Sequence, residues 1–330
     1  MAADPRFFEP RFFTREHIEK HRRSAPAALA EEAVHCLELV AELVESGLPF
    51  QFKGGNSLLL ILPEPKRFSI DVDIATNASR EQIEQCLDTV INRFRVFRRW
   101  EKRQHKTKPW LPIASWYLFF DSVIKGGTET SIMLDAQLRR SPYKTERKKI
   151  ACGKLYESTT LVELPLASSI IGDKLLTLGP NTLGIPVGRG KEAQRLKHVF
   201  DISRLLATQP PLSEVRESFR ACLRHENEIQ DRSKSAVKAF TAEEIIKDTM
   251  TFCRSVTPYS EMPPDSNLSP IMSENVRGLP VFAGHLFDAG YSWSTLRRDM
   301  ARVALCMAAI QNTHLSDQDF LSTINELPLR

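Results

Sequence analysis

The sequence has no pair of cysteines spaced closely enough to signal a zinc ribbon or a redox motif. Such sites use C-x-x-C pairs, whereas the cysteines of this chain lie tens of residues apart. The pattern favours buried free thiols in a reducing compartment, and we therefore expect a cytoplasmic protein. The six residues are Cys36, Cys86, Cys152, Cys222, Cys253 and Cys306.

Long apolar runs and a strong net charge are also missing. No stretch reaches the roughly 18 apolar residues of a membrane span, and the opening MAADPRFFEPRFFTREH has acids and prolines where a secretory signal has a basic and then an apolar region. The formal net charge is only +4, which alone says little about partners. The sequence also has no G-x-S-x-G elbow and no P-loop, so serine hydrolase and P-loop NTPase chemistry have no support. We expect no membrane partner.

The chain is long enough for two domains. Its 330 residues, 42% hydrophobic and 26% charged, with 14 glycines and 20 prolines, are typical of a globular protein. Patterns of strands and helices up to about residue 165 predict an α/β unit, 1–165, and the helical spacing that follows predicts a mostly helical half, 166–330. The predicted helices cover 26–46, 80–100, 164–178, 191–208, 212–231, 241–255, 292–312 and 315–326, and 257–280 is predicted to be a loop.

The strand RFSIDVDIA carries two carboxylates on one face. Asp71 and Asp73 are two residues apart, so in a strand they point the same way. Two ionised carboxylates so close together repel each other unless a cation lies between them. Hard carboxylate oxygens suit magnesium, which usually also binds substrate phosphates. The alternative, a solvated strand face, remains open at this stage.

A glycine turn precedes this strand. PFQFKGG predicts a short strand that ends in Gly54 and Gly55. The apolar run that follows is expected to form a brief helix from Asn56 or Ser57, with a strand as the alternative. Glycines let the backbone approach a ligand closely, and the free N–H groups of a helix start attract phosphate. A phosphate cradle beside a magnesium ligand pair is therefore expected.

These two motifs together resemble the AbiEii-type toxin nucleotidyltransferases, a branch of the polymerase-β-like nucleotidyltransferase superfamily. In this branch Lys-Gly-Gly, a small polar residue and an apolar run precede Arg-x-Ser-x-Asp-x-Asp. The resemblance covers about residues 50–75 and 165–207. It implies an α+β fold: a polymerase-β-like core with a mixed or antiparallel sheet, followed by a mostly helical C-terminal half. The residues that fit its front motif are Lys53, Gly54, Gly55, Arg67, Ser69, Asp71 and Asp73.

The resemblance also implies site residues further along the chain. The superfamily usually adds a third carboxylate, for which Asp135 in TSIMLDAQL is the candidate and Asp121 the fallback. The family carries a lysine on a helix after the sheet, here Lys174, and a later helix matched by Asp201. Arg195 and Lys197 precede Asp201, and His198 stands where the family often has an acid. Each of these residues also has an ordinary structural interpretation, such as a surface pair for Lys197 and Asp201.

The roles that follow are those of a metal-dependent nucleotidyltransferase. Asp71 and Asp73 would hold Mg²⁺ or Mn²⁺ on the NTP, and Asp135 would complete the metal site or act as the base. Lys174 would neutralise phosphate charge, and Asp201 would orient Lys174 or a metal-bound water. The residues expected to bind the nucleotide phosphates are Lys53, Gly54, Gly55, Asn56, Ser57, Arg67, Ser69, Arg195 and Lys197.

Two basic runs bear on the acceptor. Residues 93–110, which include Trp100 and Trp110, and residues 139–154 concentrate lysine and arginine. Such runs can bind a nucleic-acid backbone while aromatic rings stack on bases, or they can form a solvated face that balances acids elsewhere. We favour RNA, such as a tRNA end, as the acceptor. Transfer to a protein side chain and a degenerate module that only binds nucleotide or RNA remain open alternatives.

By resemblance, the protein is expected to be the toxin of a bacterial toxin–antitoxin or phage-defence system. Its expected partners are an NTP, an RNA acceptor and an antitoxin protein.

Overall fold

The structure, a computed structural model, describes residues 9–103, 112–232, 238–287 and 290–327. Its contacts divide the chain into two units, one of residues 1–141 and 145–165 and the other of residues 142–144 and 166–330. Strands belong to the first unit and the second is helical, so the predicted α+β class is confirmed. Trp110 of the first basic run lies outside the described residues. That the helical half completes the active site remains a prediction.

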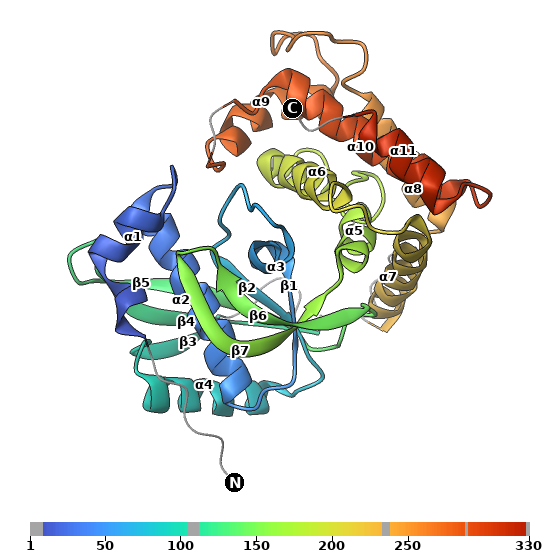
Figure 1. Ribbon diagram of the computed structural model, residues 1–330. Helices are drawn as coiled ribbons and strands as arrows, with labels where there is room; N and C mark the ends of the chain where they lie inside the picture. The colour runs from blue at the N-terminus through green and yellow to red at the C-terminus, as the bar shows by residue number, and fades with distance from the viewer. Residues whose placement is uncertain (1–8, 104–111, 233–237, 288–289, 328–330) are drawn as a thin grey trace. The chain divides into compact units, whose positions relative to one another are not determined.

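A mixed five-stranded sheet forms the centre of the first unit, in the order β1-β2-β5-β4-β3 (Figure 1). Strands β2 and β5 run parallel, and the other neighbours are antiparallel. Strands β4 and β5 form the hairpin predicted around Lys125–Gly127. The bounds are β1 Gln51–Lys53, β2 Asp71–Ala75, β3 Arg99–Arg103, β4 Ile113–Ser122 and β5 Thr128–Gln137.

Helices α2 (Ala27–Glu45) and α4 (Arg80–Phe94) cover one face of this sheet. Every second residue of a strand points to that face, where apolar side chains such as Val72 of β2 and Leu134 of β5 are buried. A capping box between Ser79 and Gln82 starts α4. Because strand side chains alternate, the residues between the core positions point to the opposite face. The remaining segments of the unit are a 3₁₀ turn, Pro10–Phe13; α1, Arg15–His21; α3, Gly54–Ile61; β6, Thr145–Cys152; and β7, Tyr156–Pro165.

Several predicted boundaries are wrong. Helix α3 starts at Gly54, and β2 starts only at Asp71, so that residues 67–70 lie outside the sheet. The helix expected over 80–100 ends at Phe94, where Arg95 adopts a left-handed conformation with φ 60°, and β3 follows. Strand β3 was missed because RWEKR has no apolar alternation. The hairpin of β6 and β7 was missed because its first strand reads as a run of charges.

Helices make up the second unit. Gly172 of α5 allows this helix to approach α7 closely, since a Cβ there would lie 2.6 Å from the backbone nitrogen of Phe219. The predicted loop 257–280 is wrong in its second half, where Pro270 occupies the first turn of α9, a position that proline favours. The bounds are α5 Ala167–Leu175, α6 Glu192–Leu206, α7 Leu212–Arg232, α8 Ala242–Arg254, α9 Pro270–Ala283, α10 Trp293–Gln311 and α11 Asp317–Asn325.

Among the described residues, no helix combines the length and the apolarity needed to cross a membrane.

A buried histidine in α2 makes the stability of the fold depend on pH. The ring of His35 stacks on Phe120 of β4, with 3.5 Å between the ring centroids, and Nδ1 lies 2.8 Å from the carbonyl oxygen of Glu31. Burial lowers the pKa of His35 to about 4 from its usual 6.5. The unfolded chain therefore binds one more proton than the folded protein between these two values.

Acidification should consequently weaken the fold. From pH 7 to pH 5 the free energy of unfolding should fall by about 2 kcal/mol on account of His35. Urea unfolding at both values, for the protein and for His35→Gln, measures this contribution. The variant should lose about 2 kcal/mol less over the same interval, and equal losses in both proteins would contradict the prediction.

Candidate active site

One row of polar residues crosses the sheet on the face opposite α2 and α4. Asp73 of β2 pairs directly with Lys53 of β1 on one side and with Asp135 of β5 on the other. Asp135 in turn pairs with Ser115 of β4. Paired residues on neighbouring strands, about 4.8 Å apart, point to the same face. The two sequence-predicted carboxylates Asp73 and Asp135 are thus direct neighbours.

Asp71 lies on the same face, two residues before Asp73 and opposite Met133 of β5. All three predicted carboxylates therefore leave one face of two parallel strands. Asp121, the fallback for the third acid, pairs with Glu129 further along the hairpin and forms an ion pair with Arg98. Asp121 is therefore not part of the row.

The donor chemistry of this face fits a divalent metal bound together with a substrate. Within the described ranges, no three His, Cys, Asp or Glu side chains are gathered into a complete metal-binding cluster. Magnesium does not need one, because it commonly takes one or two carboxylates and completes its shell with water and substrate phosphates. The neighbouring oxygens of Asp73 and Asp135, with Asp71 beside them, meet that requirement.

The glycine turn lies directly against this face. Gly54 has φ +74°, and a Cβ on it would overlap the carboxylate oxygen Oδ2 of Asp73 and lie 2.6 Å from the Asp73 Cβ. Ser57 donates a hydrogen bond to the Gly54 carbonyl oxygen over 2.8 Å, and Asn56 donates to the Asp71 carbonyl oxygen over 3.2 Å. The start of α3 is therefore held against β2 at the two carboxylates.

Gly55 makes a second close approach, to the segment before β2. A Cβ on Gly55 would lie 2.7 Å from Oγ of Ser69 and 3.1 Å from Nη2 of Arg67. Both side chains are buried, and Arg67 donates to the carbonyl oxygen of Phe68 over 3.2 Å. Arg67 and Ser69 thus lie beside the glycine turn, as the front motif requires if they serve the same site.

A pocket of about 260 Å³ opens beside the row. Lys53 reaches across β2 to donate a hydrogen bond over 3.0 Å to Oε1 of Gln137, and buried Ser115 donates to Oδ1 of Asp135. Sequence reasoning missed Ser115 and Gln137. Ser115 can be recognised only by its pairing with Asp135, and Gln137 only by its position two residues after Asp135. The pocket is lined by Lys53, Asp73, Ile74, Ile113, Ala114, Ser115, Asp135, Ala136 and Gln137.

The carboxylates impose a negative potential on their surroundings. Burial raises the pKa of the Cys36 thiol in α2 well above its usual value, and the charge of Asp71 raises it further. Burial likewise raises the pKa of Glu32, and Asp71 adds a smaller contribution. Negative charge that already penalises other anions is the environment in which a cation binds favourably.

The second unit contains the predicted lysine and aspartate as a buried ion pair. Nζ of Lys174 in α5 lies 3.0 Å from Oδ2 of Asp201 in α6, and both side chains are less than a tenth exposed. The Lys174 ammonium also lies 3.4 Å from Nδ1 of His198. The helices therefore bring together Lys174 and Asp201, which are far apart in the sequence.

Arg195, which we predicted to bind phosphate, is buried in the second unit. Its guanidinium donates to Glu274 of α9 over 2.8 Å and to the carbonyl oxygen of Ile185 over 2.7 Å. These contacts hold α6 against α9 and give no support to a phosphate contact. Lys197, on the same helix, is half-buried.

Six cations of the basic runs have acidic partners within their own unit. In the first run, Arg98 pairs with Asp121, Arg99 lies 2.6 Å from Glu129, and Lys102 lies 2.8 Å from Glu84. In the second run, the paired residues are Arg140 with Glu163, Lys144 with Glu217 and Lys149 with Glu157. For these cations the structure favours charge balance over nucleic-acid binding.

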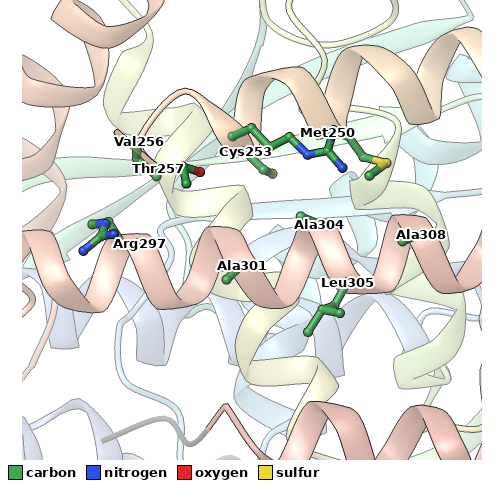
Figure 2. Close-up of a pocket in the computed structure, with 10 residues that line it drawn as sticks. Met250, Cys253, Val256, Thr257, Arg297, Ala301, Ala304, Leu305 and Ala308 are labelled. Atoms are coloured by element: carbon green, nitrogen blue, oxygen red, sulfur yellow. The ribbon is translucent and has the colours of Figure 1, made fainter. Parts of the chain in front are cut away.

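A second cavity, of about 340 Å³, lies between α8 and α10 (Figure 2). Small side chains such as Ala301 and Ala304 of α10 face Cys253 of α8 across it, and Arg297 lies near one end. Its described lining has no carboxylate or imidazole, so it offers no usual ligand for magnesium. The carboxylate pocket of the first unit is therefore the candidate site.

Comparisons with known proteins bear on the family and the fold of the chain. The family model described as "Nucleotidyl transferase AbiEii toxin, Type IV TA system" matches residues 38–268. Among solved structures, MenT4, a nucleotidyltransferase toxin from Mycobacterium tuberculosis H37Rv, matches with TM-score 0.56 and 14% identity, over 95% of this chain and 97% of that one. At that identity the match supports the fold alone.

An antigenic nucleotidyltransferase-like protein from Paracoccidioides brasiliensis also matches, with TM-score 0.39 and 14% identity, over 63% of this chain and 94% of that one. No curated protein matches the sequence significantly.

The contact between Gly54 and Asp73 is open to a direct test. Gly54→Ala should lower activity by about 100-fold, because the new methyl group displaces the Asp73 carboxylate. The left-handed conformation adds a stability cost of roughly 1–2 kcal/mol. Gly126→Ala is the matched control, since Gly126 has φ +67° but open space around its Cβ position. The measurements are nucleotidyl transfer and thermal unfolding.

The control should lose similar stability and keep its activity. If both variants lose activity equally, backbone strain rather than the Asp73 contact is responsible.

Proposed function

Because the chain belongs to the AbiEii family of nucleotidyltransferase toxins, we propose that its carboxylate pocket transfers a nucleoside monophosphate from an NTP to RNA with the help of Mg²⁺ or Mn²⁺. The chain is a nucleotidyltransferase by family. The metal, the RNA acceptor and the residue roles are our proposals. The observation that carries them is the direct pairing of Asp73 with Asp135, next to the Gly54 turn.

Asp71, Asp73 and Asp135 would hold the metal. When bound, the metal neutralises charge on the triphosphate and on the leaving pyrophosphate. The side chains supply the alignment: two neighbouring strands fix the carboxylates, and the Ser115 hydroxyl fixes one oxygen of Asp135. The other oxygen of Asp135 can then accept the proton of the acceptor hydroxyl.

The group transfer is an in-line displacement. The acceptor oxygen forms a bond to the α-phosphorus while the bond to the bridging oxygen of pyrophosphate breaks. The proton of the acceptor hydroxyl goes to Asp135. Since the chain only has to position reactants and neutralise charge, a rigid row of carboxylates on a sheet suits this reaction.

The glycine turn would bind the β- and γ-phosphates. The first turn of α3 presents backbone N–H groups and the positive end of the helix dipole, which attract anions. The absence of side chains on Gly54 and Gly55 lets that backbone pack directly against Asp73 and Ser69. Lys53 and Arg67, on either side of the turn, add positive charge.

Lys174 is proposed as a further phosphate contact and Asp201 as the residue that positions its ammonium. The resemblance supports these roles. The 3.0 Å ion pair with Asp201 would hold the long, flexible side chain of Lys174 in one direction. A purely structural role of this ion pair is the alternative. The two explanations predict different activities for a variant that lacks both charges.

The proposed biological role is that of the toxin component of a type IV system, acting on RNA, with a tRNA end as the specific acceptor. The family supports the toxin role and an antitoxin counterpart. Transfer to a protein side chain or binding without transfer would appear as distinct outcomes in the same assay.

The direct test is label transfer from each α-labelled NTP to total RNA. With Mg²⁺ or Mn²⁺ we expect labelled RNA, and the double variant Asp71→Asn/Asp73→Asn should lower the rate roughly 100- to 1,000-fold. Asp121→Asn is the control, because Asp121 is a carboxylate of the same sheet outside the row. Removal of the metal with EDTA should stop transfer.

Undiminished transfer by the double variant would refute the proposed site. Label on protein rather than RNA would establish the first alternative, and NTP binding without any labelled product the second.

The ion pair of the second unit gives a separate prediction. Lys174→Met alone should destabilise the protein by about 3–5 kcal/mol, because it leaves Asp201 buried without its cation. The double variant Lys174→Met/Asp201→Leu should recover most of that stability. If Lys174 binds phosphate, the double variant remains inactive despite its recovered fold; recovery of activity would show that the pair is only structural. Thermal unfolding and label transfer measure the two effects.

A further inference from the structure

The polar row does not end at Ser115 but continues to the edge of the sheet. Arg103, the last residue of β3, pairs with Ser115 of β4, so it shares the face of Asp135 and Asp73. Its neighbour Lys102 faces the other way, toward Glu84 of α4. The side chains of this part of the basic run therefore alternate between the two faces of the sheet.

Arg103 differs from the other cations of this strand in its partner. Its guanidinium Nη1 donates over 3.1 Å to the sulfur of Met133, a weak acceptor. Arg98, Arg99 and Lys102 all have acidic partners, whereas Arg103 has none within ion-pair distance among the residues that the structure describes. Met133 pairs with Asp71, so Arg103 extends over the carboxylate face toward the proposed metal ligands.

An aromatic ring lies beside this arginine. Tyr117 of β4 is two residues from Ser115 and pairs with Met133 on one side and with Glu101 of β3 on the other. It is half-buried on the same face. The β4–β3 side of the carboxylates therefore presents the exposed Arg103 and the half-buried Tyr117, with Ser115 between Asp135 and Arg103.

The two sides of the carboxylate row have different chemistry. On the β1 side, Gly54, the start of α3 and Lys53 suit the compact, highly charged triphosphate. On the β3 side, one cation and one ring suit a single phosphate and a neighbouring base. In-line transfer requires the acceptor and the leaving pyrophosphate to lie on opposite sides of the α-phosphorus.

We propose that Arg103 and Tyr117 bind the acceptor RNA, the guanidinium on a backbone phosphate and the ring stacked on an unpaired base. Single-stranded RNA is held by this combination of charge and stacking. The inference rests on the proposed function for the identity of the acceptor, and it adds the surface that holds it. Arg103 is exposed, so its replacement leaves the packing of the sheet intact.

The test measures RNA binding without catalysis. The probe is a fluorescent single-stranded RNA of about 12 nucleotides, a length within the usual site sizes of such proteins, in the absence of NTP and divalent metal. Arg103→Gln should weaken binding about 10-fold and reduce the slope of log K against log salt by about 0.7, the value of one phosphate contact. Lys102→Gln, from the same strand but the opposite face, should bind like the unchanged protein.

Tyr117 is tested by a matched pair of variants. Tyr117→Leu should weaken binding about 10-fold by removing the stacking ring, whereas Tyr117→Phe keeps the ring and should retain binding. Loss of binding in both variants would mean that the phenol hydroxyl or the fold, not the ring, is responsible, and would overturn the stacking role.

Steady-state kinetics place the arginine on the acceptor or the nucleotide side. Arg103→Gln should raise the KM for RNA while leaving the KM for NTP unchanged. A raised KM for NTP alone, or RNA binding equal to that of the unchanged protein, would overturn the inference, as would failure of the unchanged protein to bind the RNA. RNA binding that depends on Arg103, without any nucleotidyl transfer, would instead contradict the proposed function and still support an RNA-binding surface at Arg103.

Discussion

The close approach of the Gly54 backbone to the Asp73 carboxylate is the constraint on which the active face depends. The carboxylate occupies the space that a side chain at position 54 would need, and φ +74° turns the chain from β1 into α3 at that point. The hydrogen bonds of Asn56 and Ser57 then fix the first turn of α3 against β2. The start of α3 and a pair of carboxylates are thereby held together without a long loop between them.

The carboxylate face concentrates acidic side chains on two neighbouring strands. In the second unit, by contrast, buried ion pairs such as Lys174 with Asp201 and Arg195 with Glu274 join opposite charges. On the carboxylate face Asp71, Asp73 and Asp135 share the row with two cations, Lys53 and Arg103. The excess of negative charge also reaches Cys36, whose pKa is raised mainly by burial and further by the charge of Asp71. A bound cation would offset that excess.

The sequence predicted the centre of this site better than its edges. Alternation around Asp71 and Asp73 indicated a strand with one acidic face, and the apolar neighbours of Asp135 indicated a second such strand, because both strands bury their other side. The pairing of Asp73 with Asp135 could not be predicted, since it depends on the register of strands that are sixty residues apart in the chain. Ser115 and Arg103 owe their places to the same register.

Charge patterns were the weakest guide. Strand β3 is exposed along most of its length, so RWEKR has no apolar period to reveal it, and its charges read as one basic run. The fold separates them: Lys102 faces α4 and Arg103 faces the carboxylates. Arg195 lies near Asp201 in the sequence, which suggested that it contacts a phosphate. In the structure the Arg195 side chain is buried and donates to Glu274.

The two sides of the row also differ in how freely they can change. Gly54 and Gly55 are fixed by close contacts with Asp73 and Ser69, so substitution there disturbs the carboxylates themselves. Arg103 lies on an edge strand, and its side chain is exposed. Replacements at such a position alter what the surface binds and leave the sheet packing intact. With the roles proposed above, such a site would keep its phosphate chemistry constant while its acceptor preference could diverge, because the two would depend on different strands of one sheet.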